Sequence, residues 1–243
     1  MREVDLKIEL NRHFDAGSGA RQGSGGSPRN ARVHDGVGAI FSSWTKLALD
    51  AFLAFTGLML LFPLILMVVA ILLVVQGRPI FIAHKRIGRN AVPFPCLKFR
   101  SMVNDATDVL AKHLASNPHL RAEWNATRKL QNDPRITPFG QFLRKSSIDE
   151  IPQLLNILCG QMSLVGPRPI VASEVELYGV YFEDYKKVRP GLTGLWQVSG
   201  RSDTSYSRRV ELDVQYVAER STWGDINIMF KTIPAVLQSR GSY

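Results

Sequence analysis

Cysteine is scarce in this sequence, and its scarcity narrows the class of protein. Only Cys96 and Cys159 are present, far apart and in no metal-ligand spacing, so both are expected to be reduced thiols in apolar surroundings. Nothing in their number or spacing indicates an oxidising compartment. The first forty residues lack the apolar segment that a secretory signal peptide needs, and no internal repeat is visible.

Acidic residues are also the minority. The 243 residues include 30 Lys and Arg against 21 Asp and Glu, which gives a formal net charge of +9. This balance suits an anionic partner: nucleic acid, a phosphate-bearing substrate or an anionic membrane face. The length is sufficient for one domain with a sizeable core or for two small ones.

The N-terminal region divides into two segments. Residues 1–40 are rich in Gly, Ser and Arg and lack apolar periodicity, so we predict a flexible N-terminal tail. Residues 41–76 contain 25 consecutive residues without a charge, Ala51 to Val75, which is typical of a membrane segment. A buried core helix is the alternative, and the length of the segment argues against it.

Pro63 stands at the centre of this segment, with twelve residues on each side. Proline removes a helical hydrogen bond, and each half would reach only about 18 Å, short of the roughly 30 Å hydrocarbon core. The positive-inside rule draws both ends to the cytoplasm, because Lys46 precedes the segment and four cations follow it: Arg78, Lys85, Arg86 and Arg89. We therefore predict a re-entrant membrane helix that bends at Pro63.

Residues 77–243 are predicted to form one cytosolic α+β domain, mainly helical with a small β-hairpin. Two strands flank the turn at residues 88–90, and alternation along the second places Lys98 and Arg100 on one face. Two stretches rich in Pro and Gly, "LVGPRP" and "VRPGLTGLWQVSGRSD", are predicted to be loops. Helices are predicted at residues 104–116, about 119–131, 139–145, from 147 or 149 onward, about 204–219 and 225–238. The last of these either lies in the membrane interface or packs on the core.

An Asp and a Glu stand side by side in "RKSSIDEIPQLL". One interpretation is structural: Asp149 caps a helix whose first turn holds Glu150 and Pro152. The other is catalytic, and the two are compatible, because a helix N-terminus also favours phosphate. Cations recur in the neighbouring motifs, each of which alone would be a solvated surface charge: Lys98, Arg100, Arg144, Arg168 and Arg201. Arg168 is the strongest of these candidates for binding phosphate, because the prolines on both sides fix its backbone.

Three blocks of this sequence resemble the signature motifs of the monotopic phosphoglycosyl transferases, bacterial sugar transferases that begin lipid-linked glycan assembly. These blocks are "KFRSM", "DPRITPFGQFLRKSSIDEIPQLLNILCGQMSLVGPRP" and "RPGLTGLWQVSGR", and the resemblance extends over residues 44–238. The sequence resembles the short form of the family, which has one membrane segment. The exopolysaccharide-initiating members, which use galactose or glucose, are the most similar in general appearance.

The resemblance implies a reaction and a role for each residue. A UDP-sugar donates its sugar 1-phosphate to a polyprenyl phosphate in the inner membrane, and UMP leaves. Asp149 matches the nucleophile that carries a covalent phosphosugar intermediate, and Glu150 matches the residue that helps to hold Mg²⁺. Arg144 and Arg168 match phosphate-binding positions, while Lys98, Arg100 and Arg201 fall in matching motifs with less specific roles. The implied partners are the UDP-sugar, the polyprenyl phosphate and membrane lipid.

One position departs from the family pattern, which often has a Ser directly before the membrane proline. Phe62 stands there instead, so a hydroxyl that would satisfy a freed backbone carbonyl is missing.

Two rival functions explain part of the sequence. A membrane-anchored basic scaffold or nucleic-acid-binding protein explains the charge, but the cations form no basic stripe, so no nucleic-acid partner is expected. A lipid pyrophosphate hydrolase would use similar acids and cations with water as the acceptor.

Overall fold

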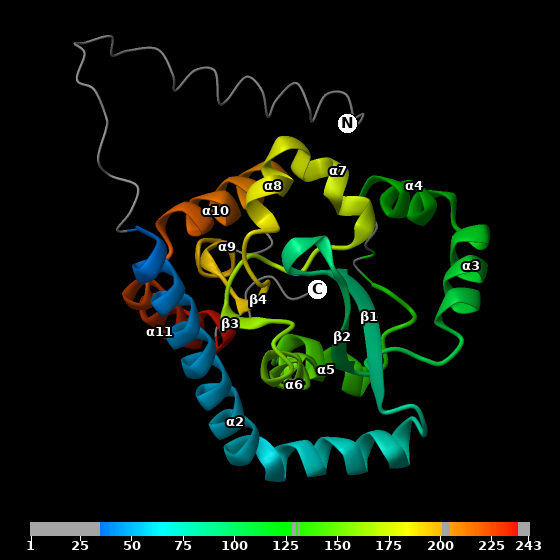
Figure 1. The fold of residues 1–243 in the computed structure, drawn as a ribbon. Helices are drawn as coiled ribbons and strands as arrows, with labels where there is room; N and C mark the ends of the chain where they lie inside the picture. Colours follow the sequence, from blue (N-terminus) through cyan, green and yellow to red (C-terminus); the bar gives the residue numbers. More distant parts are fainter. Residues whose placement is uncertain (1–34, 128–129, 131, 201–204, 238–243) are drawn as a thin grey trace.

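The computed structural model describes residues 35–127, 130, 132–200 and 205–237, so most of the predicted tail lies outside the described residues. The described residues begin with one long helix, α2 (Asp35–Val75), and a mainly helical domain with two small sheets packs against it. In Figure 1 the helix passes along one side and underneath the rest of the molecule. The α+β class with a long apolar N-terminal helix is therefore confirmed.

Helix α2 begins at Asp35, earlier than the predicted boundary at residue 41. Within it, Trp44–Val75 is long and apolar enough to cross a membrane. Only 11% of its most apolar stretch of 18 residues is buried in the protein. The core helix of a soluble domain would be mostly buried, so this exposure favours a lipid-facing helix. Pro63 lies inside the helix, and in Figure 1 the two ends of α2 run in different directions.

The predicted hairpin is confirmed. Strands β1 (Phe81–Ile87) and β2 (Pro93–Phe99) pair antiparallel around a turn that includes the short 3₁₀ helix η1 (Arg89–Ala91). The register places Ile82 opposite Lys98, His84 opposite Cys96 and Arg86 opposite Phe94. Directly opposite residues share a face of the sheet, so Arg86 and Lys98 project from the same side of the hairpin.

The helices that follow lie near the predicted positions. They are α3 (Ala106–Ser116), α4 (Pro118–Thr127), α5 (Pro138–Lys145), η2 (Ile148–Glu150) and α6 (Gln153–Leu158). The last two helices of the domain, α10 (Tyr206–Glu219) and α11 (Thr222–Leu237), were also predicted correctly within a few residues. Each of these two carries an apolar stripe long enough to show its helical period in the sequence.

The two stretches predicted as loops each overlap a short strand, which the sequence did not reveal. Strands β3 (Ser163–Val165) and β4 (Gly191–Thr193) pair in parallel. Glycines allow this approach: a Cβ on Gly191 would lie 2.1 Å from the backbone nitrogen of Gly166. Strands of three residues built around such contacts have no alternation to recognise. The segment between them holds the short helices η3 (Ala172–Glu174), α7 (Val175–Tyr178), η4 (Gly179–Tyr181) and α8 (Phe182–Tyr185), and α9 (Leu195–Val198) follows β4.

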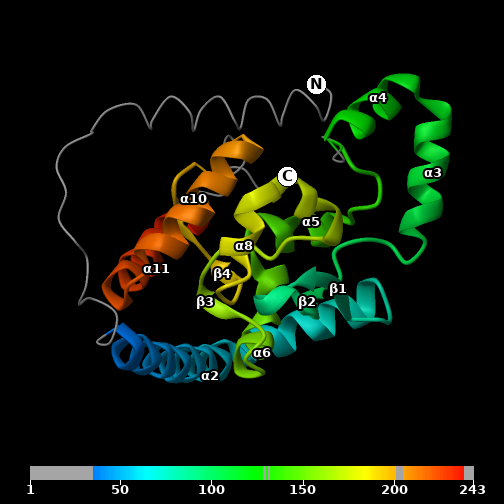
Figure 2. The same cartoon turned by 45° about the horizontal axis from the view of Figure 1, so that its top comes forward.

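The core links α2 to the hairpin through α6 and α5. Ala54 of α2 packs with Leu154 of α6 and Phe94 of β2. Further along α2, Leu72 packs with Phe99 of β2 and Leu143 of α5. Figures 1 and 2 show that α6, α5 and the hairpin all lie close to α2. The residues that follow Leu143 in the chain are therefore held close to the membrane helix.

Candidate active site

Asp149 and Glu150 lie in η2, between α5 and α6, and neither caps a helix. Helix α6 begins at Gln153, with Pro152 at its cap and no side-chain capping bond. The prediction that Asp149 is an N-cap is therefore wrong, while Ser147 does precede η2. Ser147 has φ 56° and ψ 15°, a left-handed conformation that is uncommon outside glycine and that often marks functional sites. This sharp turn leaves the Asp149 carboxylate available for other partners.

Lys98 brings the two carboxylates together. Its Nζ donates a hydrogen bond to Glu150 Oε1 at 2.6 Å and lies 3.5 Å from Asp149 Oδ2. The Asp149 side chain is buried, with 6% of the residue exposed, whereas Glu150 is more open. One ammonium group therefore partly neutralises a buried carboxylate and an adjacent, more accessible one.

The side chain of Asn156 sets the distance between β2 and the carboxylates. It accepts a hydrogen bond from the backbone N–H of Leu97 at 2.9 Å and donates to the carbonyl of Pro95 at 2.7 Å. A buried amide with both ends satisfied by one strand works like an extra strand partner. Because Asn156 is in α6, these bonds fix that helix against the strand that carries Lys98. No pattern in the sequence indicated this role.

Burial and charge move the two carboxyl pKa values in opposite directions. Burial raises the pKa of Asp149, and the adjacent Glu150 adds to this, while Lys98 and Arg144 only partly oppose it. Burial would also raise the pKa of Glu150, but Lys98, Arg168 and Arg86 outweigh it and lower that pKa. The negative charge is thus better stabilised on Glu150 than on Asp149. A less stabilised carboxylate is the more reactive nucleophile of the two.

Arg144 reaches the site from α5. Its Nε donates to Ser101 Oγ at 2.8 Å, and the Asp149 charge partly offsets the lowering of its pKa by burial. Thr137 caps the start of this helix, and its hydroxyl accepts a hydrogen bond from the backbone N–H of Gly140. A Cβ at Gly140 would lie 2.0 Å from the carbonyl oxygen of Ser101, so only glycine allows this contact. Gly140 therefore lets α5 approach closely enough to hold Arg144 beside Asp149.

Arg168 approaches from the other side, in the turn after β3. Its guanidinium lies 5.3 Å from the ring centroid of Trp196, and Arg209 lies 5.4 Å from the same centroid. Burial and the neighbouring Arg209 lower the pKa of Arg168, while Glu150 opposes the shift. A cation stacked on an indole is held in a fixed orientation. Arg168 is thus a preorganised positive charge within electrostatic range of the carboxylate pair.

Arg86 is a member of the site that the sequence reasoning missed. Its Nη1 donates to the carbonyl of Pro169 at 3.3 Å and lies 3.9 Å from Glu174, and its charge helps to lower the pKa of Glu150. From the sequence, Arg86 was predicted only to be one of the cations that flank the membrane segment. Pairing the two predicted strands would have placed Arg86 on the same face as Lys98, which is the signal that was available.

One other predicted site residue, Arg100, does not join this group. Strand β2 ends at Phe99, so Arg100 does not continue the face of Lys98. It is buried and donates to the carbonyls of Gln76 at 2.6 Å and Gly77 at 2.8 Å, and also to Asn104. These bonds attach the end of α2 to the domain. Arg201 lies outside the described residues, and its role stays a prediction.

Asp213 is a buried carboxyl group close to Arg168 and Arg209. It is 2% exposed and accepts a hydrogen bond from the hydroxyl of Tyr178 at 2.7 Å. Burial raises the pKa of Asp213 to about 7, although this hydrogen bond, the charges of Arg209 and Arg168 and the backbone N–H of Arg168 oppose the shift. The pKa of this buried carboxyl group near Arg168 therefore lies close to neutral pH.

This raised pKa predicts a pH-dependent stability. A carboxyl whose folded pKa is about 7, against an ordinary value of 3.8, contributes stability that is complete below about pH 4 and is lost as pH rises through 7. Asp213→Asn removes the charge but keeps an acceptor for Tyr178. We expect the variant to gain several degrees of Tm relative to the wild type as the pH rises from about 5 to about 8, since each kcal/mol shifts Tm by about 2–4 °C. Parallel Tm curves for the two proteins would contradict this.

The donor set limits how a metal could be held. Among the residues that the structure describes, no three His, Cys, Asp or Glu side chains gather into a metal site. Asp149 and Glu150 offer carboxylate oxygens, and Lys98 already occupies Glu150 Oε1. Mg²⁺ in proteins is commonly bound by one or two carboxylates together with substrate phosphates and water. The residues present therefore fit an ion that is shared with a diphosphate.

The fold and the site together define a membrane-associated protein that concentrates four cations around a carboxylate pair. The model of the bacterial sugar transferase family matches residues 41–239. The chain is similar to the exopolysaccharide production protein ExoY of Rhizobium meliloti (strain 1021), 52% identical over 198 residues that cover 82% of this chain and 88% of that protein.

Two longer proteins are also similar. The UDP-galactose-lipid carrier transferase of Erwinia amylovora is 46% identical over 212 residues, 87% of this chain and 44% of that protein. The undecaprenyl-phosphate galactose phosphotransferase of Salmonella typhimurium (strain LT2) is 52% identical over 168 residues, 69% of this chain and 35% of that protein. The chain therefore belongs to the bacterial sugar transferase family, and the prediction of a phosphoglycosyl transferase is confirmed.

Proposed function

We propose that this enzyme transfers a sugar 1-phosphate, of galactose or glucose type, from a UDP-sugar to undecaprenyl phosphate and releases UMP. The single observation that carries the proposal is the buried Asp149 carboxylate, held close to Lys98 and Arg144 beside a lipid-facing helix. The names of the relatives, which include a UDP-galactose-lipid carrier transferase and an exopolysaccharide production protein, support galactose as the sugar and a place in exopolysaccharide assembly.

The proposed chemistry has two displacements at one phosphorus atom. An oxygen of Asp149 attacks the phosphorus that bears the sugar, the bond to the bridging oxygen of the diphosphate breaks, and UMP leaves with the electron pair. A phosphate oxygen of the lipid then attacks the same phosphorus and releases the Asp149 carboxylate. A carboxylate needs no general base, because it is ionised without one. Lys98, Arg144, Arg168 and Arg86 offset the repulsion between the diphosphate and the two carboxylates.

Mg²⁺ is the proposed cofactor, held by Glu150 and the diphosphate. When bound, it supplies further charge neutralisation at the phosphate oxygens. Glu150 is suited to this position because its pKa is lowered and it is more exposed than Asp149. Lys98 and the ion would share the Glu150 carboxylate. The positive charge of Lys98 keeps that carboxylate in the ionised form that a metal needs.

Glu150→Gln is expected to lower activity mainly through metal use. The amide keeps the size of the side chain and an oxygen acceptor for Lys98, but it binds Mg²⁺ more weakly than a carboxylate does. We expect the Mg²⁺ concentration that gives half-maximal UMP release to rise about tenfold or more. Titration of both proteins with MgCl₂ at saturating donor measures this. An unchanged Mg²⁺ dependence would refute the metal role.

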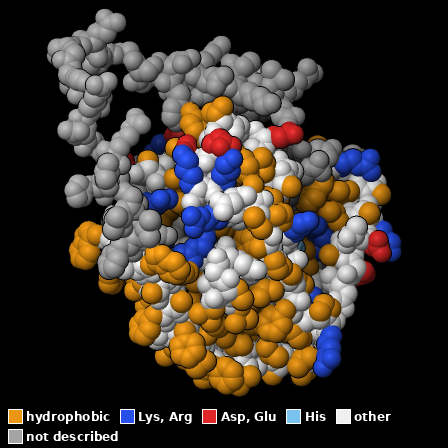
Figure 3. All heavy atoms as spheres, in the orientation of Figure 1, with side chains coloured by type: hydrophobic (Ala, Val, Ile, Leu, Met, Phe, Trp, Pro, Cys, Tyr) orange, Lys and Arg blue, Asp and Glu red, His pale blue; other side chains and the backbone are white. Residues whose placement is uncertain are grey.

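The proposed setting is the inner membrane, with α2 as a re-entrant helix that bends at Pro63 and leaves both of its ends on the cytoplasmic side. In Figure 3 apolar side chains cover the lower part of the molecule, where Figure 1 places α2. The phosphate of a polyprenyl phosphate lies at the surface of the same leaflet. An enzyme anchored there reaches it without extracting the lipid.

Replacing Pro63 with Leu is expected to change this topology. The variant has 25 uncharged residues without a proline, about 38 Å as a straight helix, which is long enough to span the membrane. A fraction of it should place the N-terminus in the periplasm. Cysteines introduced before residue 35, in a background that lacks Cys96 and Cys159, would then react with a thiol reagent that cannot cross the membrane. Labelling of the same cysteines without the Pro63 change would contradict the re-entrant model.

The reaction itself is tested by mixing the protein with UDP-galactose or UDP-glucose and Mg²⁺, with and without undecaprenyl phosphate. We expect sustained UMP release only when the lipid is present. Sustained release without the lipid would instead indicate a hydrolase with water as the acceptor. Absence of release with either donor, and with a wider panel of UDP-sugars, would refute the proposed transfer.

A further inference from the structure

A second cationic pocket lies away from the carboxylate pair. It has a volume of about 290 Å³ and is bounded by the first part of α2, the segment after α8 and the turn between α10 and α11. None of Lys98, Asp149, Glu150, Arg144 and Arg168 lines it. Its charged lining consists of five cations and one acid: Lys46, Arg89, Lys187, Arg189, Arg220 and Asp225.

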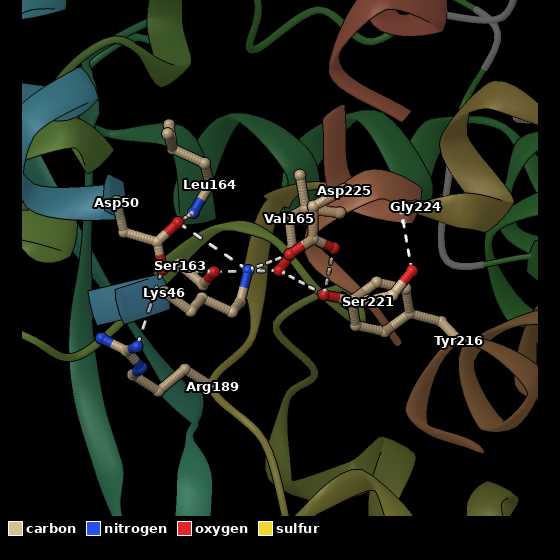
Figure 4. A network of polar contacts seen from close by, with 10 residues as sticks. All are labelled: Lys46, Asp50, Ser163, Leu164, Val165, Arg189, Tyr216, Ser221, Gly224 and Asp225. Carbon is tan, nitrogen blue, oxygen red and sulfur yellow. Dashed lines mark hydrogen bonds and ion pairs between the residues drawn. The ribbon is translucent and has the colours of Figure 1, made fainter. Parts of the chain in front are cut away.

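The acidic groups at this pocket are already occupied. Asp225 accepts from Lys46 Nζ at 2.6 Å and from the hydroxyl of Tyr216 at 2.9 Å. Asp50, behind the wall, lies 3.6 Å from Arg189 and accepts from Ser163 at 2.8 Å. Figure 4 shows these contacts, in which Asp50 faces both Lys46 and Arg189 and Asp225 faces Lys46. The positive charge of the pocket is therefore only partly neutralised from within the protein.

Two of the cations have no internal partner among the residues described. The side chains of Arg89 and Arg220 form no hydrogen bond or ion pair with any described residue. Arg89 is also close enough to Arg189 for its like charge to lower the pKa of that residue, after the larger effect of burial. Like charges gathered at a cavity are favourable when an anion lies between them. Helix α11 begins at Thr222, on the wall of the pocket, and directs its positive end there.

The surroundings place this pocket at the depth of lipid head groups. Trp44 on α2 is 68% exposed and Trp223 on α11 is 78% exposed. Exposed tryptophans beside a lipid-facing helix are typical of the membrane–water interface. An adjoining cavity of about 450 Å³ shares Arg89 and Arg189, and Trp44, Leu47, Val92 and Phe94 form part of its wall. A charged pocket that continues into an apolar one matches a phosphate group attached to an acyl chain.

We propose that this pocket binds the phosphate head group of an anionic membrane phospholipid, separately from the catalytic site. The inference rests on the membrane association in the proposed function but not on the transfer chemistry. The shared chemistry is a phosphate anion, which a phospholipid, free phosphate or the phosphate of undecaprenyl phosphate could each supply. The adjoining apolar cavity and the interfacial tryptophans favour the phospholipid.

Native mass spectrometry of the full chain in a neutral detergent tests this proposal. The probes are short-chain phosphatidylglycerol, short-chain phosphatidylcholine, inorganic phosphate and undecaprenyl phosphate. We expect one phosphatidylglycerol to be retained, and phosphatidylcholine to be retained far less. In Arg89→Gln/Arg220→Gln the retained phosphatidylglycerol should fall by about tenfold or more, because two charge-assisted contacts are lost. The matched control is Lys112→Gln/Arg121→Gln, two exposed cations on α3 and α4, which should retain the lipid normally.

The outcomes separate this site from the proposed function. The double variant should keep its Tm and its lipid-dependent UMP release in detergent, so failure of the transfer reaction would not affect this result. Unchanged retention of phosphatidylglycerol in the double variant would overturn the proposal. So would equal retention of phosphatidylcholine, binding of inorganic phosphate without any lipid, or a loss confined to undecaprenyl phosphate, which would make the pocket an acceptor site.

Discussion

Asp149→Asn is expected to reduce turnover by at least about a thousandfold, because the variant lacks the nucleophile of the proposed reaction. The amide has the shape of the carboxylate and keeps an oxygen that can accept from Lys98, 3.5 Å away in the wild type. It cannot form the acyl phosphate, however. Removal of a buried carboxyl whose pKa is raised by burial should not destabilise the fold. The loss is therefore expected in kcat, with little change in Tm, and steady-state UMP release measures it.

Asp184→Asn is the matched control for this experiment. Asp184 lies in α8 and pairs with Lys187, a surface contact that contributes little. The same Asp-to-Asn change there should leave turnover within about twofold of the wild type. If Asp149→Asn kept turnover close to that of the control, Asp149 would not be the nucleophile.

Lys98→Met is expected to lower activity by about a hundredfold or more and to move the acid limb of the pH–rate profile to higher pH. Lys98 is the cation that touches both carboxylates, and it lowers the pKa of each. Without it both pKa values rise, so the ionised carboxylates are present only at higher pH. Activity should therefore recover partly as the pH is raised. Rates at saturating donor across the pH range measure the shift.

Lys98→Arg is the companion variant. It keeps the positive charge but not the compact ammonium geometry, so activity should be reduced while the acid limb stays near its wild-type position. If Lys98 had only a structural role, both variants would have lower rates, and the acid limb of the pH–rate profile would stay in place for each of them. An unshifted limb in Lys98→Met would thus show that Lys98 does not control the ionisation of the pair.

The parts of the fold that could be predicted are those with a regular period. The hairpin at 81–99 and the helices α5, α10 and α11 repeat their apolar residues at strand or helix spacing. Strands β3 and β4 were missed because they depend on contacts between glycines that are far apart in the chain. The short helices α7 and α8, of four residues each, are too short to show a helical period.

The site was predictable where a motif carries the chemistry and not where it depends on packing. Asp149, Glu150, Arg144 and Arg168 came from the motif resemblance, and the structure places them near one another. Alternation placed Arg100 on the face of Lys98, but the strand ends between them. The role of Asn156 could not be predicted from the sequence, because its hydrogen-bond partners are backbone groups 59 and 61 residues earlier in the chain. No local pattern encodes a contact at that separation.

The covalent intermediate on Asp149 is the central claim, and intact-protein mass spectrometry tests it most directly. Wild-type protein is incubated with UDP-galactose and Mg²⁺ in the absence of lipid, quenched with acid and weighed. We predict that the mass rises by one hexose phosphate, that added undecaprenyl phosphate removes this adduct, and that Asp149→Asn never acquires it. A wild-type enzyme that turns over normally without any adduct, or an equal adduct on Asp149→Asn, would contradict the account.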